Sequence, residues 1–304
     1  MTGRARLALR LSVGAALLVG VVLGAVVAGV PPGLSSEASL RERLPERSMT
    51  PATAAQEASL ASTLLASVRG TGPLACDLVM RGLNNNWGGW HVTPTLHAAG
   101  EQQNRRQVLD WALARPHGAD AIDPLREGLD SADACERRIS ARLLGVIRDP
   151  SVLGVLREAL GAADPKTQEA AILALGYSER SDAVDPLRNT LASGTVELKR
   201  ASAWALGQIE RPEALADLVR ALSDADTGVR ANAAWALGQI ESRSAVDPLS
   251  GALADADREV RFNAARALGQ IEDPAAIPPL VALLASDGDD GVRRAAAWAL
   301  GQIE

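Results

Sequence analysis

Three tryptophans, each followed four residues later by a glutamine, are the residues of this sequence best suited to bind another molecule. They are Trp204, Trp235 and Trp298, and each opens an identical phrase, Trp-Ala-Leu-Gly-Gln-Ile-Glu. Indole rings and amides supply no acid–base or nucleophilic chemistry, but they give large apolar contacts and directed hydrogen bonds, which are prominent in protein–protein interfaces. The phrase therefore predicts a binding surface, provided that the fold brings its copies onto one face.

Residue types that catalyse reactions or bind metals lack the spacing that these tasks need. His91, His97 and His117 lie in irregular N-terminal sequence without companion metal ligands. There is no His-Glu-x-x-His, no Gly-x-Ser-x-Gly and no phosphate-binding glycine loop. The Asp-Gly-Asp-Asp stretch at 287–290 lacks the acidic twelfth position of a calcium loop and favours helix capping. We therefore expect no enzymatic activity, no catalytic residues, no cofactor and no metal site.

The tryptophan phrase belongs to a repeat of 31 residues. Its glycine stands at 145, 176, 207, 238 and 269, and after a step of 32 residues at 301. Each unit has a first helix such as 183–191, with a proline near its start, and a second helix such as 229–241. An acidic turn lies between them, and its last aspartate, such as Asp226, is placed to cap the second helix. A period of this size is typical of a solenoid, in which each repeat packs on its neighbours.

These helix pairs resemble the HEAT-like repeats named after phycobilisome lyases. Val229-Arg230, Val260-Arg261 and Val292-Arg293 open the second helices, Leu198-Lys199 is a close variant, and Ala-Leu-Gly-Gln-Ile ends them. The resemblance covers residues 101–304 and implies an all-α fold, a right-handed α-solenoid whose second helices line the concave side. Members of the family mostly serve as scaffolds, although related solenoids include bilin lyases and DNA glycosylases.

Helical geometry divides each second helix into a buried stripe and an exposed face. At 100° per residue, Val229, Leu237 and Ile240 fall in one apolar stripe, whereas Trp235 and Gln239 point away from it. The exposed columns hold aromatic, arginine and amide side chains, which we expect to bind a protein or peptide in a concave groove. The predicted partner-binding residues are Arg138, Arg142, Tyr177, Arg200, Trp204, Gln208, Asn232, Trp235, Gln239, Phe262, Asn263, Arg266, Gln270, Arg294, Trp298 and Gln302.

Other interpretations of these residues stay open. A tryptophan could lean onto the neighbouring second helix and be mostly buried between repeats. The array could also associate with itself, because the unit that ends at Glu304 has no polar closing helix. On the binding interpretation, Arg200, Arg266 and Arg294 are expected to pair with acids of the ligand.

A second basic column is expected to be structural. Arg230 and its equivalents lie at the edge of the buried stripe, where geometry and resemblance both indicate ion pairs with turn or first-helix acids such as Asp185, Asp217 or Asp247. The equivalents of Arg230 are Arg137, Lys199, Arg261 and Arg293.

The N-terminal part of the sequence predicts a membrane topology. Residues 1–10 are a short basic tail, 11–30 an uncharged apolar run of spanning length, 31–56 a flexible linker, and 57–100 atypical capping helices with a tryptophan-containing loop. The basic flank should stay in the cytoplasm, so a single N-terminal pass would anchor an extracytoplasmic, periplasmic solenoid. A cleaved signal peptide and a secreted chain are the alternative.

The charge beyond residue 30 argues against a nucleic-acid partner. Three of the 31 basic residues lie in the first ten positions, which leaves 28 against 37 acidic residues, a net charge of −9. Such an acidic body does not favour binding to a phosphate backbone, which also disfavours the glycosylase alternative.

Cys76 and Cys135 would meet an oxidising compartment and could form a disulfide, although two buried thiols fit the sequence equally well.

Overall fold

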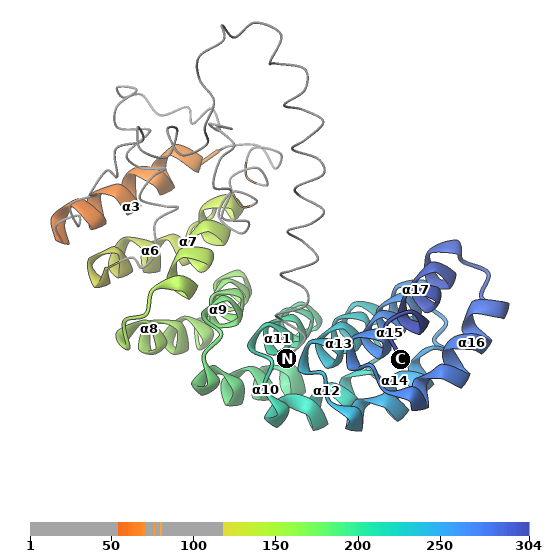
Figure 1. Ribbon diagram of the computed structural model, residues 1–304. Coiled ribbons are helices and arrows are strands. Elements are labelled where there is room, and N and C mark those ends of the chain that lie inside the picture. Colours follow the sequence, from red (N-terminus) through yellow and green to blue (C-terminus); the bar gives the residue numbers. More distant parts are fainter. Residues whose placement is uncertain (1–53, 71–75, 77–79, 81–117, 304) are drawn as a thin grey trace, which may run out of the picture. The chain divides into compact units, whose positions relative to one another are not determined.

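The computed structural model describes residues 54–70, Cys76, Met80 and residues 118–303 (Figure 1). The chain divides into two units, Met1–Pro51 and Ala52–Glu304, and the first lies outside the described residues. The predicted basic tail, the apolar run 11–30 and most of the linker therefore lie outside them, as do the three histidines and the predicted tryptophan loop. Among the described residues, no helix is long and apolar enough to cross a membrane.

The regular elements of the described residues are all helical, and most of them form consecutive pairs. Helix α3 (Ala54–Val68) comes first and begins inside the predicted linker. The first helices of the pairs are α6 (Ile122–Leu129), α8 (Ser151–Leu160), α10 (Val184–Ser193), α12 (Leu215–Ala221), α14 (Val246–Ala252) and α16 (Ile277–Ser286). The second helices are α7 (Ala134–Val146), α9 (Pro165–Ser178), α11 (Val196–Ile209), α13 (Thr227–Ile240), α15 (Arg258–Ile271) and α17 (Asp290–Leu300). Short 3₁₀ turns precede most first helices: η2 (Ala119–Ala121), η3 (Ser181–Ala183), η4 (Pro212–Ala214), η5 (Arg243–Ala245) and η6 (Pro274–Ala276).

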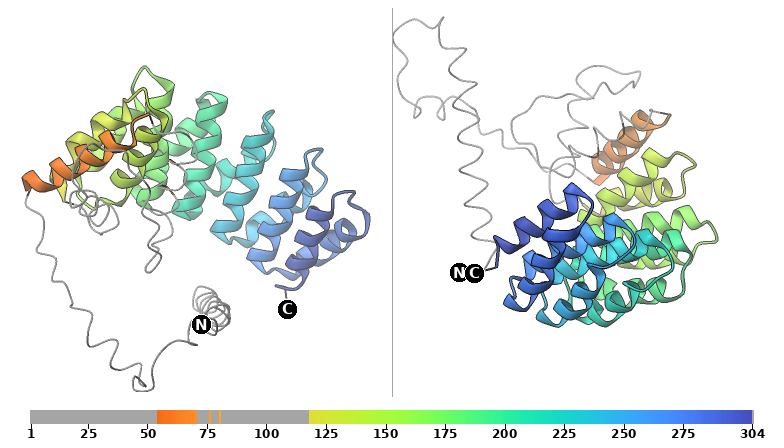
Figure 2. Two further views of the ribbon diagram at one scale, coloured as in Figure 1. Left: turned by 90° about the horizontal axis from the view of Figure 1, so that it is seen from above. Right: turned by 90° about the vertical axis from the view of Figure 1, so that its right-hand side faces the viewer.

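The helices of the pairs stand in two rows, one of first helices and one of second helices (Figures 1 and 2). Each second helix packs along the next one, whereas successive first helices touch much less. The close approach depends on glycine: a Cβ atom at Gly207 would lie 2.8 Å from the Cα atom of Ala236, and one at Gly269 would lie 2.7 Å from that of Ala299. Because the second helices are more closely spaced, the stack curves with its second helices on the concave side.

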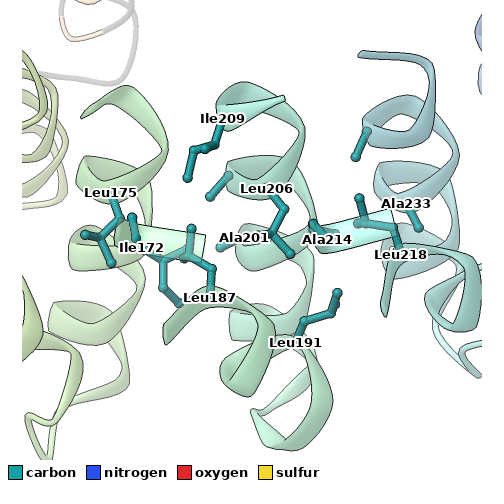
Figure 3. Packing of buried hydrophobic residues seen from close by; sticks show 14 of the residues in the cluster. Ile172, Leu175, Leu187, Leu191, Ala201, Leu206, Ile209, Ala214, Leu218 and Ala233 are labelled. Carbon is teal, nitrogen blue, oxygen red and sulfur yellow. The ribbon is translucent and has the colours of Figure 1, made fainter. Parts of the chain in front are cut away.

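The core is built from small and aliphatic side chains contributed by neighbouring repeats. Leu187 of α10, Leu206 of α11 and Leu218 of α12 are fully buried and meet in one continuous cluster (Figure 3). Burying one such side chain stabilises the fold by about 1.5–3 kcal/mol. In α13, Val229 is fully buried as its position in the repeat predicts, whereas Ile240, at the end of the helix, is half-buried.

Aspartates in the turns cap the second helices, as the sequence predicts. The carboxylate of Asp226 accepts a hydrogen bond from the backbone N–H of Val229 at 3.0 Å, and Asp289 accepts from the N–H groups of Gly291 and Val292 at 2.8 and 3.1 Å. Each bond satisfies an amide that has no partner within the helix, and such a cap stabilises by about 1 kcal/mol. The Asp-Gly-Asp-Asp stretch therefore has a structural role at the start of α17.

The second basic column forms an ion-pair ladder, but with other acids than those expected. Arg230 donates from Nε and Nη2 to Asp255 of the following turn at 2.8 and 3.0 Å, and from Nη1 to the carbonyl of Asp224 at 2.9 Å. Arg261 repeats this arrangement, and Lys199 contacts Asp224 at 3.0 Å. The predicted pairing with turn acids is confirmed, but the partners are not Asp185, Asp217 or Asp247, because the basic side chains reach forward into the turn of the next repeat. Other members of the column bond nearby turn residues, Arg137 to the carbonyl of Ser131, and Arg293 to the carbonyl of Asp287 and to Asp290.

Helix α3 and the residues after it are fastened to the start of α7. Cys76 and Cys135 form a disulfide with a Cα–Cα distance of 5.5 Å. Arg69 donates two hydrogen bonds to Glu136, at 3.0 and 2.9 Å, and the Glu136 side chain is only 4% exposed. The backbone N–H of Gly70 donates to Asp133 at 2.8 Å. One covalent bond and several polar contacts therefore hold α3 at this end of the stack.

Candidate partner-binding face

The residues predicted to bind a partner lie on or directly after the second helices, but their exposure differs widely. All five predicted arginines were expected to be exposed, and four of them are. The exposed ones are Arg138, Arg200, Arg266 and Arg294. The half-buried members are Tyr177, Trp204, Gln208, Asn232, Trp235, Gln239, Phe262, Asn263, Gln270, Trp298 and Gln302. The buried member is Arg142.

Each tryptophan of the repeated phrase lies over the glycine of the preceding second helix. A Cβ atom at Gly207 would come within 2.6 Å of Cζ3 of Trp235, and Gly269 stands in the same relation to Trp298 at 2.8 Å. Both indoles are partly buried against the core and remain partly exposed. The tryptophans therefore pack between repeats and also present part of each ring to the concave side. The sequence feature that marks this contact is the glycine three residues after each tryptophan, because the glycine of one copy lies under the tryptophan of the next. From the sequence alone, this glycine served only to measure the repeat.

An aromatic cluster covers Arg142 near the N-terminal end of the row. The Arg142 guanidinium carbon lies 4.8 Å from the centre of the Tyr177 ring, and Tyr177 meets Trp204 edge-on, with ring centres 5.1 Å apart. Arg142 is only 8% exposed, and burial raises the pKa of Tyr177. The prediction that Arg142 is exposed is wrong, because the tyrosine of the next repeat packs against it.

The two asparagines of the predicted site bond the preceding repeat. Nδ2 of Asn232 donates to the carbonyl of Arg200 at 2.8 Å, and Nδ2 of Asn263 donates to the carbonyl of Ala231 at 3.1 Å. Ala231 itself is buried, although its column was expected to be exposed. Part of the hydrogen-bonding capacity of both amides is therefore used within the stack.

The arrangement changes where Arg266 replaces the tryptophan of the phrase. Here Gln270, and not an indole, lies over the glycine of the preceding helix: its Oε1 would be 2.5 Å from a Cβ atom at Gly238. The guanidinium of Arg266 lies over the indole of Trp298, with its central carbon 4.4 Å from the ring centre. This stacked geometry is a cation–π contact, which favours a fixed position for the positive charge.

Arg200 is already paired within the protein. Its Nε and Nη2 donate to the two carboxylate oxygens of Asp226 at 2.6 and 2.5 Å. These bonds hold the pKa of Asp226 down, to about 2. The expectation that Arg200 pairs with acids of a ligand therefore loses its basis, since its charge is neutralised by the cap of α13.

Comparison with known proteins identifies the repeats. A family described as HEAT repeats matches in four overlapping windows, residues 122–207, 155–227, 184–261 and 217–301. No curated protein matches the chain.

Several solved structures are similar to this chain at low sequence identity. Kap121p shares 15% identity with a TM-score of 0.52, over 82% of this chain and 31% of that one. A designed armadillo repeat protein in complex with the peptide (KR)4 shares 22% identity with a TM-score of 0.43, over 59% and 98%. Human deoxyhypusine hydroxylase in complex with glycerol shares 20% identity with a TM-score of 0.32, over 76% and 99%. With helix pairs in two rows and family matches across residues 122–301, this chain belongs to the HEAT-repeat family.

Proposed function

We propose that this protein is a non-enzymatic scaffold whose concave row of second helices binds a protein or peptide partner. The observation behind the proposal is that Trp204, Trp235 and Trp298 each present part of an indole on this row while the rest of the ring is fixed by packing. Phe262 and Tyr177, which are also partly exposed, extend the aromatic surface along the row.

The seating of these rings favours binding on physical grounds. A side chain loses rotamer freedom when a partner immobilises it, at a cost of about 0.5–1.5 kcal/mol. An indole that already rests on the glycine of the neighbouring helix has lost most of that freedom in the free protein. Partly buried tryptophans are also the residue type most often found at the energetic centre of an interface.

The proposal also covers the type of repeat, the attachment to a membrane and the compartment. The repeats would belong to the phycobilisome-lyase type of HEAT-like repeat. Residues 11–30 would tether the stack to a membrane with the stack on the extracytoplasmic, periplasmic side, or would be cleaved to release it. The disulfide between Cys76 and Cys135 favours an oxidising compartment. No nucleic-acid partner is proposed, because the net charge beyond residue 30 is negative.

Affinity capture with the full chain tests the proposal. The chain is immobilised in detergent and exposed to solubilised membrane proteins, with Trp235→Ala as the test variant. Loss of a hot-spot indole weakens binding by about 2 kcal/mol, roughly thirtyfold, so the captured partner should be lost or strongly reduced.

Because Trp235 also packs on Gly207, the capture needs a control for stability. Arg230→Lys weakens the ladder between repeats without touching the concave rings, and it should capture the partner as the wild type does. Both variants are used well below their unfolding temperatures. Equal capture by the wild type and Trp235→Ala, or equal loss with both variants, would disprove binding through the indole row.

Self-association through the face of α16 is a second candidate function, favoured by one observation. Ile277, Val281 and Leu284 of this helix are 37%, 49% and 36% exposed. Their counterparts 31 residues earlier include Val246 and Leu253, which are only 4% and 7% exposed. A second copy of the chain could cover this stripe. Sedimentation of the wild type against Val281→Asp tests the idea, and a wild type that stays monomeric at high concentration disproves it.

A further inference from the structure

The cations of the second helices differ in whether the protein itself neutralises them. Lys199, Arg230 and Arg261 each contact an aspartate of the following turn, and Arg200 is paired with Asp226. Within the described part of the chain, Arg266 and Arg294 form no ion pair, and both are exposed on the last two second helices. The concave row therefore keeps two positive charges available at one end.

These two arginines lie near the same indole, one on the adjacent helix and one on the same helix. Arg266 of α15 is stacked on Trp298 of the adjacent helix α17, with 4.4 Å between the guanidinium carbon and the ring centre. Arg294 stands four residues before Trp298, so the two share one face of α17. Phe262, which is partly exposed, stands four residues before Arg266, so the two share one face of α15. Two cations and two aromatic rings thus form one patch, which we call the arginine–aromatic patch.

The chemistry of the patch selects one class of ligand. A guanidinium that lies over an indole keeps N–H donors on its rim, and two of these donors fit both oxygens of a carboxylate. The chain is acidic beyond residue 30, with a net charge of −9. Two neighbouring arginines without ion pairs therefore make a locally positive site in a negative electrostatic potential. The two aromatic rings beside these charges add contact area for an apolar side chain.

We propose that the arginine–aromatic patch binds an acidic segment of the partner protein, in which two carboxylates bracket an apolar residue. The carboxylates pair with Arg266 and Arg294, and the apolar residue covers Trp298. This proposal rests on partner binding by the concave row and specifies the chemistry of that partner.

Peptide binding to the full chain in detergent tests the proposal. The probes are a rhodamine-labelled peptide Gly-Ser-Glu-Leu-Glu-Ser-Gly and the same peptide with both Glu replaced by Gln, followed by fluorescence anisotropy. The acidic peptide should bind at least about tenfold more tightly than its neutral counterpart, and added salt should weaken it. R266Q and R294Q should each weaken it about threefold to fivefold, as expected for a partly exposed ion pair.

Matched variants separate the patch from general charge effects. Arg126→Gln removes an exposed arginine of α6, in the first-helix row, that has no ion pair within the described residues, and it should leave binding unchanged. Arg266→Lys keeps the charge but loses the planar stack and fork, so it should restore binding only in part. Thermal unfolding of R294Q and R126Q should match the wild type because both arginines are exposed, whereas R266Q should unfold at a slightly lower temperature because it loses the cation–π contact with Trp298.

Several results would overturn the proposal. Equal binding of the two peptides would show that carboxylates are not read, and equal weakening by R126Q would show a general charge effect. Heparin bound more tightly than the acidic peptide, with the same dependence on both arginines, would assign the patch to phosphorylated or sulfated polyanions. If neither peptide binds while membrane capture still depends on Trp235, acidic selectivity is wrong and partner binding by the concave row stands. If the capture fails as well, the proposed function fails with it.

Discussion

The indole of Trp235 rests on Gly207 of the preceding repeat, so closely that a Cβ atom at the glycine would come within 2.6 Å of Cζ3. The same hypothetical atom would lie 2.8 Å from both Cα and Cβ of Ala236. The tryptophan phrase therefore works across repeats: the glycine of one copy makes room for the tryptophan and alanine of the next. The ring that we propose to bind a partner therefore also packs between repeats.

Replacing Gly207 by alanine should destabilise the stack. The new methyl group would overlap Trp235 and the backbone of Ala236, and overpacking of this kind costs about 1–3 kcal/mol. Urea unfolding measures the loss. Gly154→Ala is the control, since nothing lies within 4 Å of its Cβ position in α8, and it should stabilise by about 0.5–1 kcal/mol. If both substitutions change the free energy of unfolding in the same direction, the close contact of Trp235 with Gly207 is contradicted.

Ser202→Ala should stabilise the protein by about 1 kcal/mol or more. Its hydroxyl is fully buried in α11 and has no hydrogen-bond partner within the described residues, which costs free energy on folding. Alanine already occupies the same register in neighbouring repeats, at Ala171, Ala233 and Ala264, and each is fully buried. Thermal unfolding checks the gain, and a lowered midpoint would mean that the hydroxyl has a partner in solution.

Arg230→Lys should weaken the ladder while keeping its charge. A lysine can still contact Asp255, as Lys199 contacts Asp224, but it loses the bonds from Nη1 to the turn carbonyls of Asp224 and Ala225. We expect a loss of about 1 kcal/mol by urea unfolding. Arg126→Lys, on the exposed side of α6, should change nothing measurable. If Arg230→Lys leaves the stability unchanged, the ladder contributes no more to the free energy of unfolding than a surface ion pair does.

The ion pair of Asp226 with Arg200 predicts a dependence of stability on pH. The pKa of Asp226 is lowered in the folded protein to about 2, chiefly by the hydrogen bonds from Arg200, whereas an unfolded aspartate titrates near about 3.9. Because the folded pKa is the lower one, this stabilisation is complete above about pH 4 and is lost as pH falls towards about 2.

Asp226→Asn tests this dependence, because asparagine keeps the cap of α13 but removes the charge. The stability difference between the wild type and this variant should therefore shrink as pH falls through that window. Asp257→Asn, at a matched cap that has no ion pair within the described residues, should show a smaller change. A difference that is constant with pH would show that the carboxylate acts only as a cap.

Glu272→Gly should stabilise the end of α15. Glu272 follows the helix in the left-handed region, with φ of 55°, which costs a side-chain-bearing residue about 1 kcal/mol relative to glycine. The midpoint of thermal unfolding should rise with glycine and stay lower with alanine, which removes the carboxylate but not the strain. Glu169→Gly, at an exposed position inside α9, should lower the midpoint instead.

Periodicity predicted the helix pairs and the caps because both depend on local rules. The 31-residue spacing placed Val229 in the core and Asp226 at the start of α13, where the structure has them. The position of a column on a helix, however, does not state what the next helix brings over it. Arg142 is buried because Tyr177 of the following repeat covers it, and this depends on packing between repeats.

The candidate site was predicted in composition but not in its internal bonds. Arg200, Arg266 and Arg294 look alike in the sequence, and only the structure shows that the first is neutralised by Asp226, 26 residues further on. The acids of the ladder were misplaced for the same reason, since Arg230 reaches the next turn rather than its own first helix. Pairing across a repeat boundary follows from the pitch of the stack, which helical angles alone do not give.

The bond between Cys76 and Cys135 joins residues 59 positions apart and closes the intervening chain into a loop. A protease that cuts once anywhere inside this loop leaves two pieces that remain covalently joined. The nicked protein would migrate as one band on a gel without reductant and as two bands after reduction. Helix α3 would thus stay attached to the repeats even after the backbone between them is cut.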